Sequence, residues 1–172
     1  MVIWIIGLSA SGKTTLGRAI YKQWKNEAPN TVFLDGDDVR KIFRHENKTQ
    51  HYTIEERKRN SDRICELCAW LDGQNINVVC SVLSLFEEAR DWNRKTYSKY
   101  FEVFVDVPMD VLKKRETKGL YAAAEKGAIK NVAGVDIPFP TPKTPDFIFD
   151  NSQDNADFEK VAQEILIETK QL

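Results

Sequence analysis

The sequence predicts an α/β fold in which a five-stranded parallel sheet carries helices on both faces. Short apolar runs alternate with segments of helical length along all 172 residues. The apolar runs contain few polar residues, which is typical of strands buried on both faces. A glycine-rich turn joins the first apolar run to the first helical segment. The chain length and the hydrophobic share of 42% indicate one folded domain over residues 1–172.

The strands are predicted from apolar runs that end at turn residues or at polar clusters. The second run ends at two aspartates around a glycine, and the fourth run is closed by Pro108. In chain order, the expected strands are Val2–Ile6, Thr31–Leu34, Asn77–Ser81, Phe101–Val107 and Phe147–Phe149.

The helices are predicted between these strands. Thr53 has the position of an N-cap, and Glu56 completes a capping box for the longest helix. Gly73 is placed to end that helix, and a polar loop, His45–His51, precedes it. The expected helices are Lys13–Lys25, a short helix to about Arg44, Thr53 to about Leu71, Phe86–Ser98, Met109–Lys118 and Ala156–Lys170.

The segment from Gly119 to Pro145 breaks this alternation. It is rich in alanine, lysine, glycine and proline and shows little periodicity. A long irregular segment inside a compact domain usually has a function, often as a lid over a site. We therefore expect a lid at about 119–145, with a disordered insertion as the alternative.

Composition excludes several classes of partner. The net charge of −1 gives no basic surplus, so we expect no nucleic-acid partner. The first residues carry no basic leader, and their apolar run is too short to span a membrane, so we expect a cytoplasmic protein without membrane contact. Cys65 and Cys68 have the C-x-x-C spacing, but they lie within a helical pattern and no second pair completes a metal set. We interpret them, with Cys80, as ordinary packing residues.

The turn after the first strand fits the phosphate-binding pattern G-x-x-x-x-G-K-[ST]. Its glycines let backbone N–H groups point inward, and the following helix directs its positive end to the same place. Lys13 would reach the terminal phosphates, and the Thr14 hydroxyl would ligate Mg²⁺. ATP and Mg²⁺ are therefore the expected cofactors, although GTPases, motor ATPases and kinases share this loop. The predicted binding residues are Gly7, Ser9, Ala10, Ser11, Gly12, Lys13, Thr14 and Thr15.

Two carboxylates follow the second strand at the edge where open α/β sheets bind ligands. Asp35 or Asp37 could take the proton from an attacking hydroxyl, or hold Mg²⁺ through water. The sequence does not decide which aspartate is the base. The alternative is a turn with a helix N-cap at Asp37 or Asp38.

A cationic cluster lies further along the chain. Arg57 and Asn60 share one helix face, and arginine suits phosphate-like anions. The alternative for these arginines is a solvated charged face. Tyr52 could stack on a base, or be a tyrosine without a ligand. The third strand ends at serines rather than the aspartate of many P-loop ATPases, which favours a kinase over a motor or a GTPase.

These segments resemble the adenylylsulfate (APS) kinase family. The resemblance rests on "GLSASGKTT", "FLDGDDVR", "ERKRN", "FEVFVDVPMDVLKKR" and "KGLYAAAEKGAIKNVAGVD", which occur in the family's order and cover nearly the whole chain. It implies the P-loop nucleoside-triphosphate hydrolase fold. It also implies transfer of the γ-phosphate of ATP to the 3′-hydroxyl of a nucleotide, and a homodimer.

The resemblance also implies roles for individual residues. Asp35 and Asp37 would be the acid pair near Mg²⁺ and the acceptor hydroxyl, Asp35 holding the metal through water. Arg115 would lie near the ATP base. The implied acceptor-binding residues are Arg40, Tyr52, Arg57, Asn60, Ser84, Lys118 and Leu120.

The departures from the family pattern fall on the acceptor side. Asp62 replaces an arginine, Leu85 replaces a proline, and Val132 replaces one of two aromatic residues around the acceptor base. Because base stacking contributes about 1–3 kcal/mol per aromatic, a smaller base is expected. We therefore expect cytidine diphosphoramidate, the acceptor of an APS-kinase-like branch in capsule phosphoramidate synthesis. The alternatives are a genuine adenylylsulfate kinase, a small-metabolite kinase and an inactive nucleotide-binding regulatory module.

Overall fold

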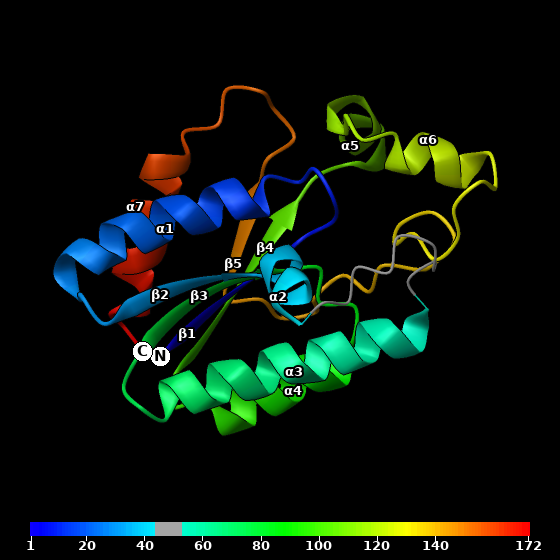
Figure 1. The fold of residues 1–172 in the computed structure, drawn as a ribbon. Helices are drawn as coiled ribbons and strands as arrows, with labels where there is room; N and C mark the ends of the chain where they lie inside the picture. The colour runs from blue at the N-terminus through cyan, green and yellow to red at the C-terminus, as the bar shows by residue number, and fades with distance from the viewer. Residues whose placement is uncertain (44–52) are drawn as a thin grey trace.

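Residues 1–43 and 53–172 are described by the computed structural model (Figure 1). The expected loop His45–His51 and Tyr52 lie outside these residues. The described strands form one parallel sheet in the order β2-β3-β1-β4-β5, which confirms the predicted fold class. Their bounds are β1 (Val2–Ile6), β2 (Thr31–Asp35), β3 (Asn77–Val82), β4 (Tyr100–Asp106) and β5 (Phe147–Asp150).

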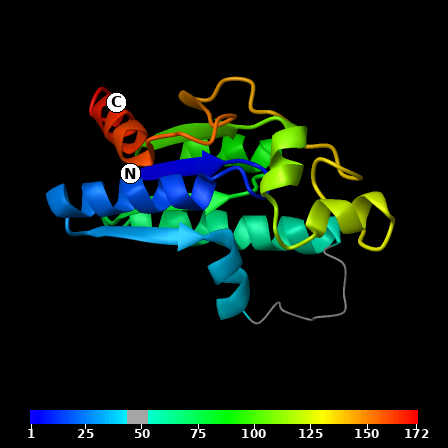
Figure 2. The ribbon, with the colours of Figure 1, turned by 90° about the horizontal axis from the view of Figure 1, so that it is seen from above.

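Helices cover both faces of the sheet, as predicted (Figures 1 and 2). One face carries α1 (Lys13–Glu27) and α7 (Phe158–Thr169), and the other carries α3 (Ile54–Asp72) and α4 (Glu87–Thr96). The strand β1 is buried throughout, and its side chains alternate between the two layers. Ile3 and Ile5 pack on the side of α1, whereas Trp4 packs on the side of α3. Continuous apolar strands arise because both faces need such residues.

The long helix α3 begins where its cap residues predict. Thr53 accepts a hydrogen bond from the amide of Glu56, and the Glu56 carboxylate accepts one from the amide of Thr53. The helix ends before Gly73, which has right-handed rather than left-handed backbone angles. The cysteines of α3 and β3, Cys65, Cys68 and Cys80, are unpaired and buried in the core between these elements.

The segment expected to be irregular contains a short helix, α6 (Leu120–Glu125), which the sequence analysis did not predict. Likewise α5 (Met109–Arg115) ends earlier than the expected Lys118, because the chain turns at Glu116. The Glu116 carboxylate accepts hydrogen bonds from the amides of Lys118 and Leu120, and these bonds organise the start of α6. The segment is packed rather than disordered, since Tyr121, Val132 and Ala133 within it are buried.

The carboxyl ends of the parallel strands meet at one edge of the sheet, beside α5 and α6 (Figure 2). The remaining helix, α2 (Gly36–Ile42), starts directly after β2 at this edge. In open α/β sheets this is the edge where ligands bind. Among the described residues, no helix is long and apolar enough to cross a membrane.

Candidate active site

The glycine-rich turn between β1 and α1 forms a tight loop that only glycine tolerates at its last position. Gly12 has φ +94°, and a Cβ there would lie 2.7 Å from the side-chain nitrogen of Asn151. Ala10 is also left-handed, with φ 63°, so the chain curls twice within a few residues. Successive N–H groups in such a curled loop can converge on an anion. The loop therefore has the geometry of a phosphate site at the N-terminus of α1.

Lys13 lies half-buried at the start of α1. Its ammonium donates to the carbonyl oxygen of Leu8 at 3.0 Å, which holds the side chain against the loop. The pKa of Lys13 is lowered to about 8, mainly by burial; Asp35 opposes this shift, and the nearby charges of Arg40 and Lys118 add to it. A phosphate group would relieve this concentration of positive charge. Lys13 is therefore placed to meet the terminal phosphates of a nucleotide.

Asp35 engages both of its carboxylate oxygens. One accepts a hydrogen bond from the Thr14 hydroxyl at 2.8 Å, and the other caps α2 by accepting from the amide of Asp37 at 2.9 Å. The cap of α2 is thus Asp35, so the alternative of a cap at Asp37 or Asp38 is wrong. A hydroxyl and a carboxylate at this separation supply the oxygen ligands that Mg²⁺ prefers, directly or through water. The pair Thr14 and Asp35 therefore fits the predicted magnesium site.

The Asp37 side chain takes part in neither of these hydrogen bonds. Its side chain is 61% exposed and forms an ion pair with Arg40, which is half-buried. Arg40 lines a pocket described below, so the pair with Asp37 lies at the border between the phosphate loop and that pocket. The two aspartates, which the sequence left equivalent, thus have different surroundings.

Asn151, at the end of β5, is a site residue that the sequence analysis missed. Its amide donates to the carbonyl of Ser11 in the phosphate loop at 2.8 Å, and its own carbonyl accepts from Arg115 at 2.6 Å. Arg115 also pairs with Asp154, so its guanidinium lies beside the loop that follows β5. A polar residue directly after a strand, the same signal that singled out Asp35, could have identified Asn151.

The helix α6 is attached to the phosphate loop through Tyr121, a second residue that was missed. The Tyr121 hydroxyl donates to the carbonyl of Ser9 at 2.9 Å, and the ring is almost fully buried. Burial raises the pKa of Tyr121 to about 12, so the phenol stays protonated and keeps this donor. The expected lid is therefore in direct contact with the loop that would hold ATP.

A pocket beside the phosphate loop brings together four of the predicted acceptor-binding residues. Arg40 comes from α2, Arg57 and Asn60 come from α3, and Ser84 follows β3. Within the described part of the chain, the side-chain oxygen of Asn60 is buried without a hydrogen-bond partner. This oxygen can accept a hydrogen bond from a ligand hydroxyl or amine, whereas the two guanidinium groups in the same pocket suit an anionic group.

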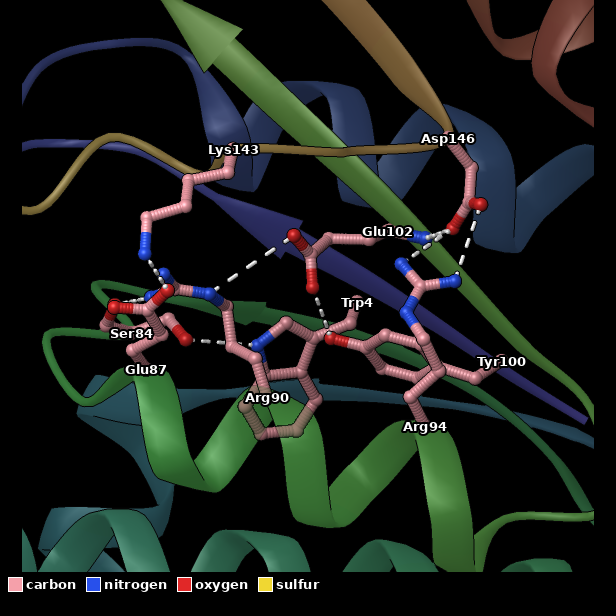
Figure 3. A network of polar contacts seen from close by, with 9 residues as sticks. All are labelled: Trp4, Ser84, Glu87, Arg90, Arg94, Tyr100, Glu102, Lys143 and Asp146. Carbon is pink, nitrogen blue, oxygen red and sulfur yellow. Dashed lines mark hydrogen bonds and ion pairs between the residues drawn. The ribbon is translucent and has the colours of Figure 1, made fainter.

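The wall and floor of this pocket are fixed by buried hydrogen bonds (Figure 3). The indole N–H of Trp4 in β1 donates to the Ser84 hydroxyl at 3.0 Å, and Arg90 in α4 donates to the Ser84 carbonyl at 3.0 Å. Ser84 has φ 53°, an uncommon angle for a residue other than glycine. The Ser84 hydroxyl thus accepts a hydrogen bond from Trp4, and this bond helps to fix the pocket lining.

Arg57 connects the pocket to the expected lid. Its guanidinium donates to the carbonyl of Asn131 at 2.7 Å. The turn that follows is held by Asp136, whose carboxylate accepts from the amides of Asn131 and Val132. Burial alone would raise the pKa of Asp136, but these amides and the charge of Arg57 lower it, so the carboxylate stays ionised. The segment expected to be a lid is therefore linked to both the phosphate loop and the pocket.

Some predicted residues lie elsewhere. Lys118 is exposed and Leu120 half-buried, and neither lines the pocket that holds the other acceptor-binding residues. Asp62, where the sequence departs from the family pattern, is exposed, pairs with Lys58 on another face of α3 and does not line this pocket. Val132 is buried in the core cluster beneath α1 and α7. Tyr52 lies outside the described residues.

A phosphate loop and a carboxylate at the end of β2 define this site as that of a P-loop kinase, and a pocket with two arginines in its lining lies beside it. The chain belongs to the adenylylsulphate kinase family, whose model matches residues 1–150. It is therefore a phosphotransferase, and the predicted family is confirmed.

Two curated relatives are about equally similar. The cytidine diphosphoramidate kinase of Campylobacter jejuni is 37% identical over 160 residues, covering 93% of this chain and 91% of the relative. The adenylyl-sulfate kinase of Clostridium kluyveri is 36% identical over 155 residues, covering 90% of this chain and 76% of the relative.

Solved structures agree with the fold. The Mycobacterium tuberculosis APS kinase in complex with AMPPNP and APS superposes with a TM-score of 0.81 at 28% identity, covering 98% of this chain and 96% of that one. The shikimate kinase of Aquifex aeolicus shares the fold at a TM-score of 0.56 and 21% identity, covering 99% of this chain and 97% of that one.

Proposed function

We propose that this kinase transfers the γ-phosphate of ATP to the 3′-hydroxyl of a modified nucleotide. The observation that carries the proposal is the convergence of Arg40, Arg57, Asn60 and Ser84 on one pocket beside Thr14 and Asp35. A donor site and an acceptor pocket with two arginines then share one edge of the sheet. In-line transfer needs this arrangement, because most of the catalysis is positioning and charge stabilisation.

Asp35 and Asp37 have different roles in this proposal. Asp35 is committed to Thr14 and to the cap of α2, so it is the residue that would hold Mg²⁺ with Thr14. A bound Mg²⁺ would neutralise charge on the phosphate oxygens and orient them. Asp37 is the more exposed carboxylate and borders the acceptor pocket through Arg40, so it is the proposed base. It would accept the proton of the 3′-hydroxyl as that oxygen attacks.

The loop, Lys13 and the lid hold the donor. Backbone N–H groups of the turn and the ammonium of Lys13 stabilise the negative charge of the transferring phosphoryl group. In this proposal the donor site also includes the other predicted ATP-binding residues: Gly7, Ser9, Ala10, Ser11, Gly12 and Thr15. Arg115 bonds to Asn151, which bonds to the phosphate loop, and this connection supports the proposed contact of Arg115 with the ATP base. Tyr121 keeps α6 in contact with the loop, which supports a lid role for residues 119–145 in excluding water.

Cytidine diphosphoramidate is the acceptor that we favour, with a role in capsule phosphoramidate synthesis. The similarity to the Campylobacter jejuni enzyme extends over nine tenths of both chains. Val132 stands where the family pattern has an aromatic residue, although it is 3% exposed and does not line the pocket. Leu85 lines the acceptor pocket where the family pattern has a proline. A pyrimidine needs less stacking surface than adenine, which agrees with the departure from an aromatic residue at position 132.

Adenylylsulfate is the competing acceptor. The similarity to the Clostridium kluyveri enzyme is almost as high, and the Mycobacterium tuberculosis kinase that shares the fold was solved in complex with APS. Steady-state kinetics with each acceptor and saturating ATP separate the two. We expect a higher kcat/KM for cytidine diphosphoramidate. Mass spectrometry and NMR of the product should show the added phosphate on the 3′-oxygen. A higher kcat/KM for adenylylsulfate would reverse the assignment.

Two further parts of the proposal concern the compartment and the oligomeric state of the enzyme. We propose that the chain acts in the cytoplasm, where ATP is available, and that it forms a homodimer as the family resemblance implies. Size-exclusion chromatography with light scattering gives the molar mass in solution. A mass near twice 19.8 kDa is expected, and a mass near 19.8 kDa would contradict the dimer.

A further inference from the structure

The pocket wall formed by Leu83 to Phe86 lies between β3 and α4 and has no regular secondary structure. Its central residue, Ser84, carries a left-handed backbone angle that costs free energy in a residue with a Cβ. Such a conformation persists only when the surroundings fix it. The fixing groups are the indole of Trp4 and the guanidinium of Arg90, which bond to the hydroxyl and the carbonyl of Ser84.

Arg90 is itself held in a buried position (Figure 3). It is 5% exposed, and its Nε lies 3.9 Å from a carboxylate oxygen of Glu102 in β4, which is 4% exposed. The other oxygen of Glu102 accepts from the hydroxyl of Tyr100 at 2.7 Å. Burial raises the pKa of Glu102, while Tyr100 and the charge of Arg90 oppose that rise. Burying two charges costs free energy that well-packed apolar residues would not.

The other ion pairs of this network differ from Arg90. Glu87, on the first turn of α4, pairs with Lys143, and Arg94 pairs with Asp146 through two hydrogen bonds of 3.2 and 3.1 Å. These pairs connect α4 to the segment before β5, and their cations are 77% and 43% exposed. Exposed pairs contribute little to stability. Within this network, it is the guanidinium of Arg90 that bonds to the pocket wall.

We propose that Arg90 is a positioning residue for the acceptor, which acts by fixing the backbone of Ser84 and with it the pocket wall. Glu102 and Tyr100 hold the guanidinium so that it aims at the Ser84 carbonyl. The buried pair of Arg90 and Glu102 thus fixes the position of the Ser84 backbone rather than adding to the stability of the fold. This inference rests on the proposed function, because it assumes that the pocket binds the nucleotide acceptor.

The test is steady-state kinetics of Arg90→Met, with ATP as donor and both candidate acceptors. The KM for the acceptor should rise about tenfold or more, as expected when a hydrogen bond from a charged donor is lost. The KM for ATP should stay within about twofold, because the phosphate loop is not held by Arg90. Arg94→Met is the matched control: it removes a guanidinium one turn along α4 that does not reach Ser84, and the acceptor KM should not change.

A folded Arg90→Met enzyme with the wild-type acceptor KM would overturn the inference, as would an equal KM increase in Arg94→Met. If Arg90→Met does not fold, the double variant Arg90→Met/Glu102→Gln leaves no lone buried charge and should show the same increase. Trp4→Phe keeps both charges, removes the other hydrogen bond to Ser84 and should raise the same KM. Unchanged acceptor KM in these variants also refutes the inference. Absence of transfer by the wild-type enzyme to either nucleotide would instead refute the proposed function.

Discussion

Replacing Asp37 by asparagine should remove the catalytic base while leaving the fold intact. The Asp37 side chain is 61% exposed, and its contact with Arg40 is an ion pair at the surface of the site. Such a pair contributes at most about 1 kcal/mol to stability. Asparagine keeps the size of the side chain and still offers an oxygen to Arg40. The free energy of unfolding should therefore change by less than about 1 kcal/mol.

The kinetic effect should be much larger than the effect on stability. A general base contributes about 10²- to 10⁴-fold to the rate, which corresponds to about 2.7–5.5 kcal/mol of barrier. Asp37→Asn should thus lower kcat at least about a hundredfold. The KM for ATP should change little, because the hydroxyl of Thr14 bonds to Asp35 and not to Asp37.

The assay is ADP release at saturating ATP and acceptor, with unfolding followed by circular dichroism. Asp38→Asn is the matched control, because Asp38 is the next residue in α2 and pairs with the exposed Lys41. That variant should keep the wild-type kcat. Asp35→Asn should act differently, by raising the Mg²⁺ concentration that half-maximal activity requires. Retention of more than half of the wild-type kcat by Asp37→Asn, or an equal loss in Asp38→Asn, would refute the assignment of the base.

Three further outcomes follow from the site. The kcat/KM for ATP should fall as the pH rises through about 8, where Lys13 loses its charge in the free enzyme. Unfolding would not explain that fall. Between a pH of about 8 and the ordinary pKa of 10.5, the unfolded chain binds more protons at Lys13 than the folded chain does, so the contribution of Lys13 to the free energy of unfolding increases as the pH rises. Tyr121→Phe removes the donor to Ser9 and should raise the KM for ATP about fivefold, measured by initial rates; an unchanged KM would show that α6 does not support the loop. Asn151→Ala leaves the carbonyl of Ser11 without its bond and should lower the free energy of unfolding in urea by about 1–3 kcal/mol, whereas Asp154→Ala, at a 92% exposed side chain, should lower it by less than about 1 kcal/mol. Equal losses would count against the role of Asn151.

The fold was predictable because local signals and burial agree. Strands such as Val2–Ile6 are apolar throughout, as burial on two faces requires, and Thr53 with Glu56 forms the capping box that their spacing predicts. The short helix α6 was not predictable from periodicity. Its six residues are too few for a helical pattern, and its start depends on the Glu116 carboxylate bonding to nearby amides.

The site was predictable where a motif fixes local geometry, and less so where packing decides. The hydrogen bond between Thr14 and Asp35 joins two segments that the motifs already singled out. The face to which Asp62 points depends on how α3 lies against α4 and β3, which no local pattern specifies. The contacts of Asn151 and Arg90 join residues distant in sequence, so their importance emerges only once the strands are placed side by side.

The relative kcat/KM of the purified enzyme for cytidine diphosphoramidate and adenylylsulfate tests the central claim most directly. Initial rates at saturating ATP, with the product identified by mass spectrometry, give this ratio in one experiment. We predict phosphorylation of both nucleotides at the 3′-oxygen, with the ratio favouring cytidine diphosphoramidate at least about tenfold, the value of about 1.4 kcal/mol in transition-state binding. A ratio that favours adenylylsulfate would contradict the proposed acceptor, and no transfer to either nucleotide would contradict the proposed reaction.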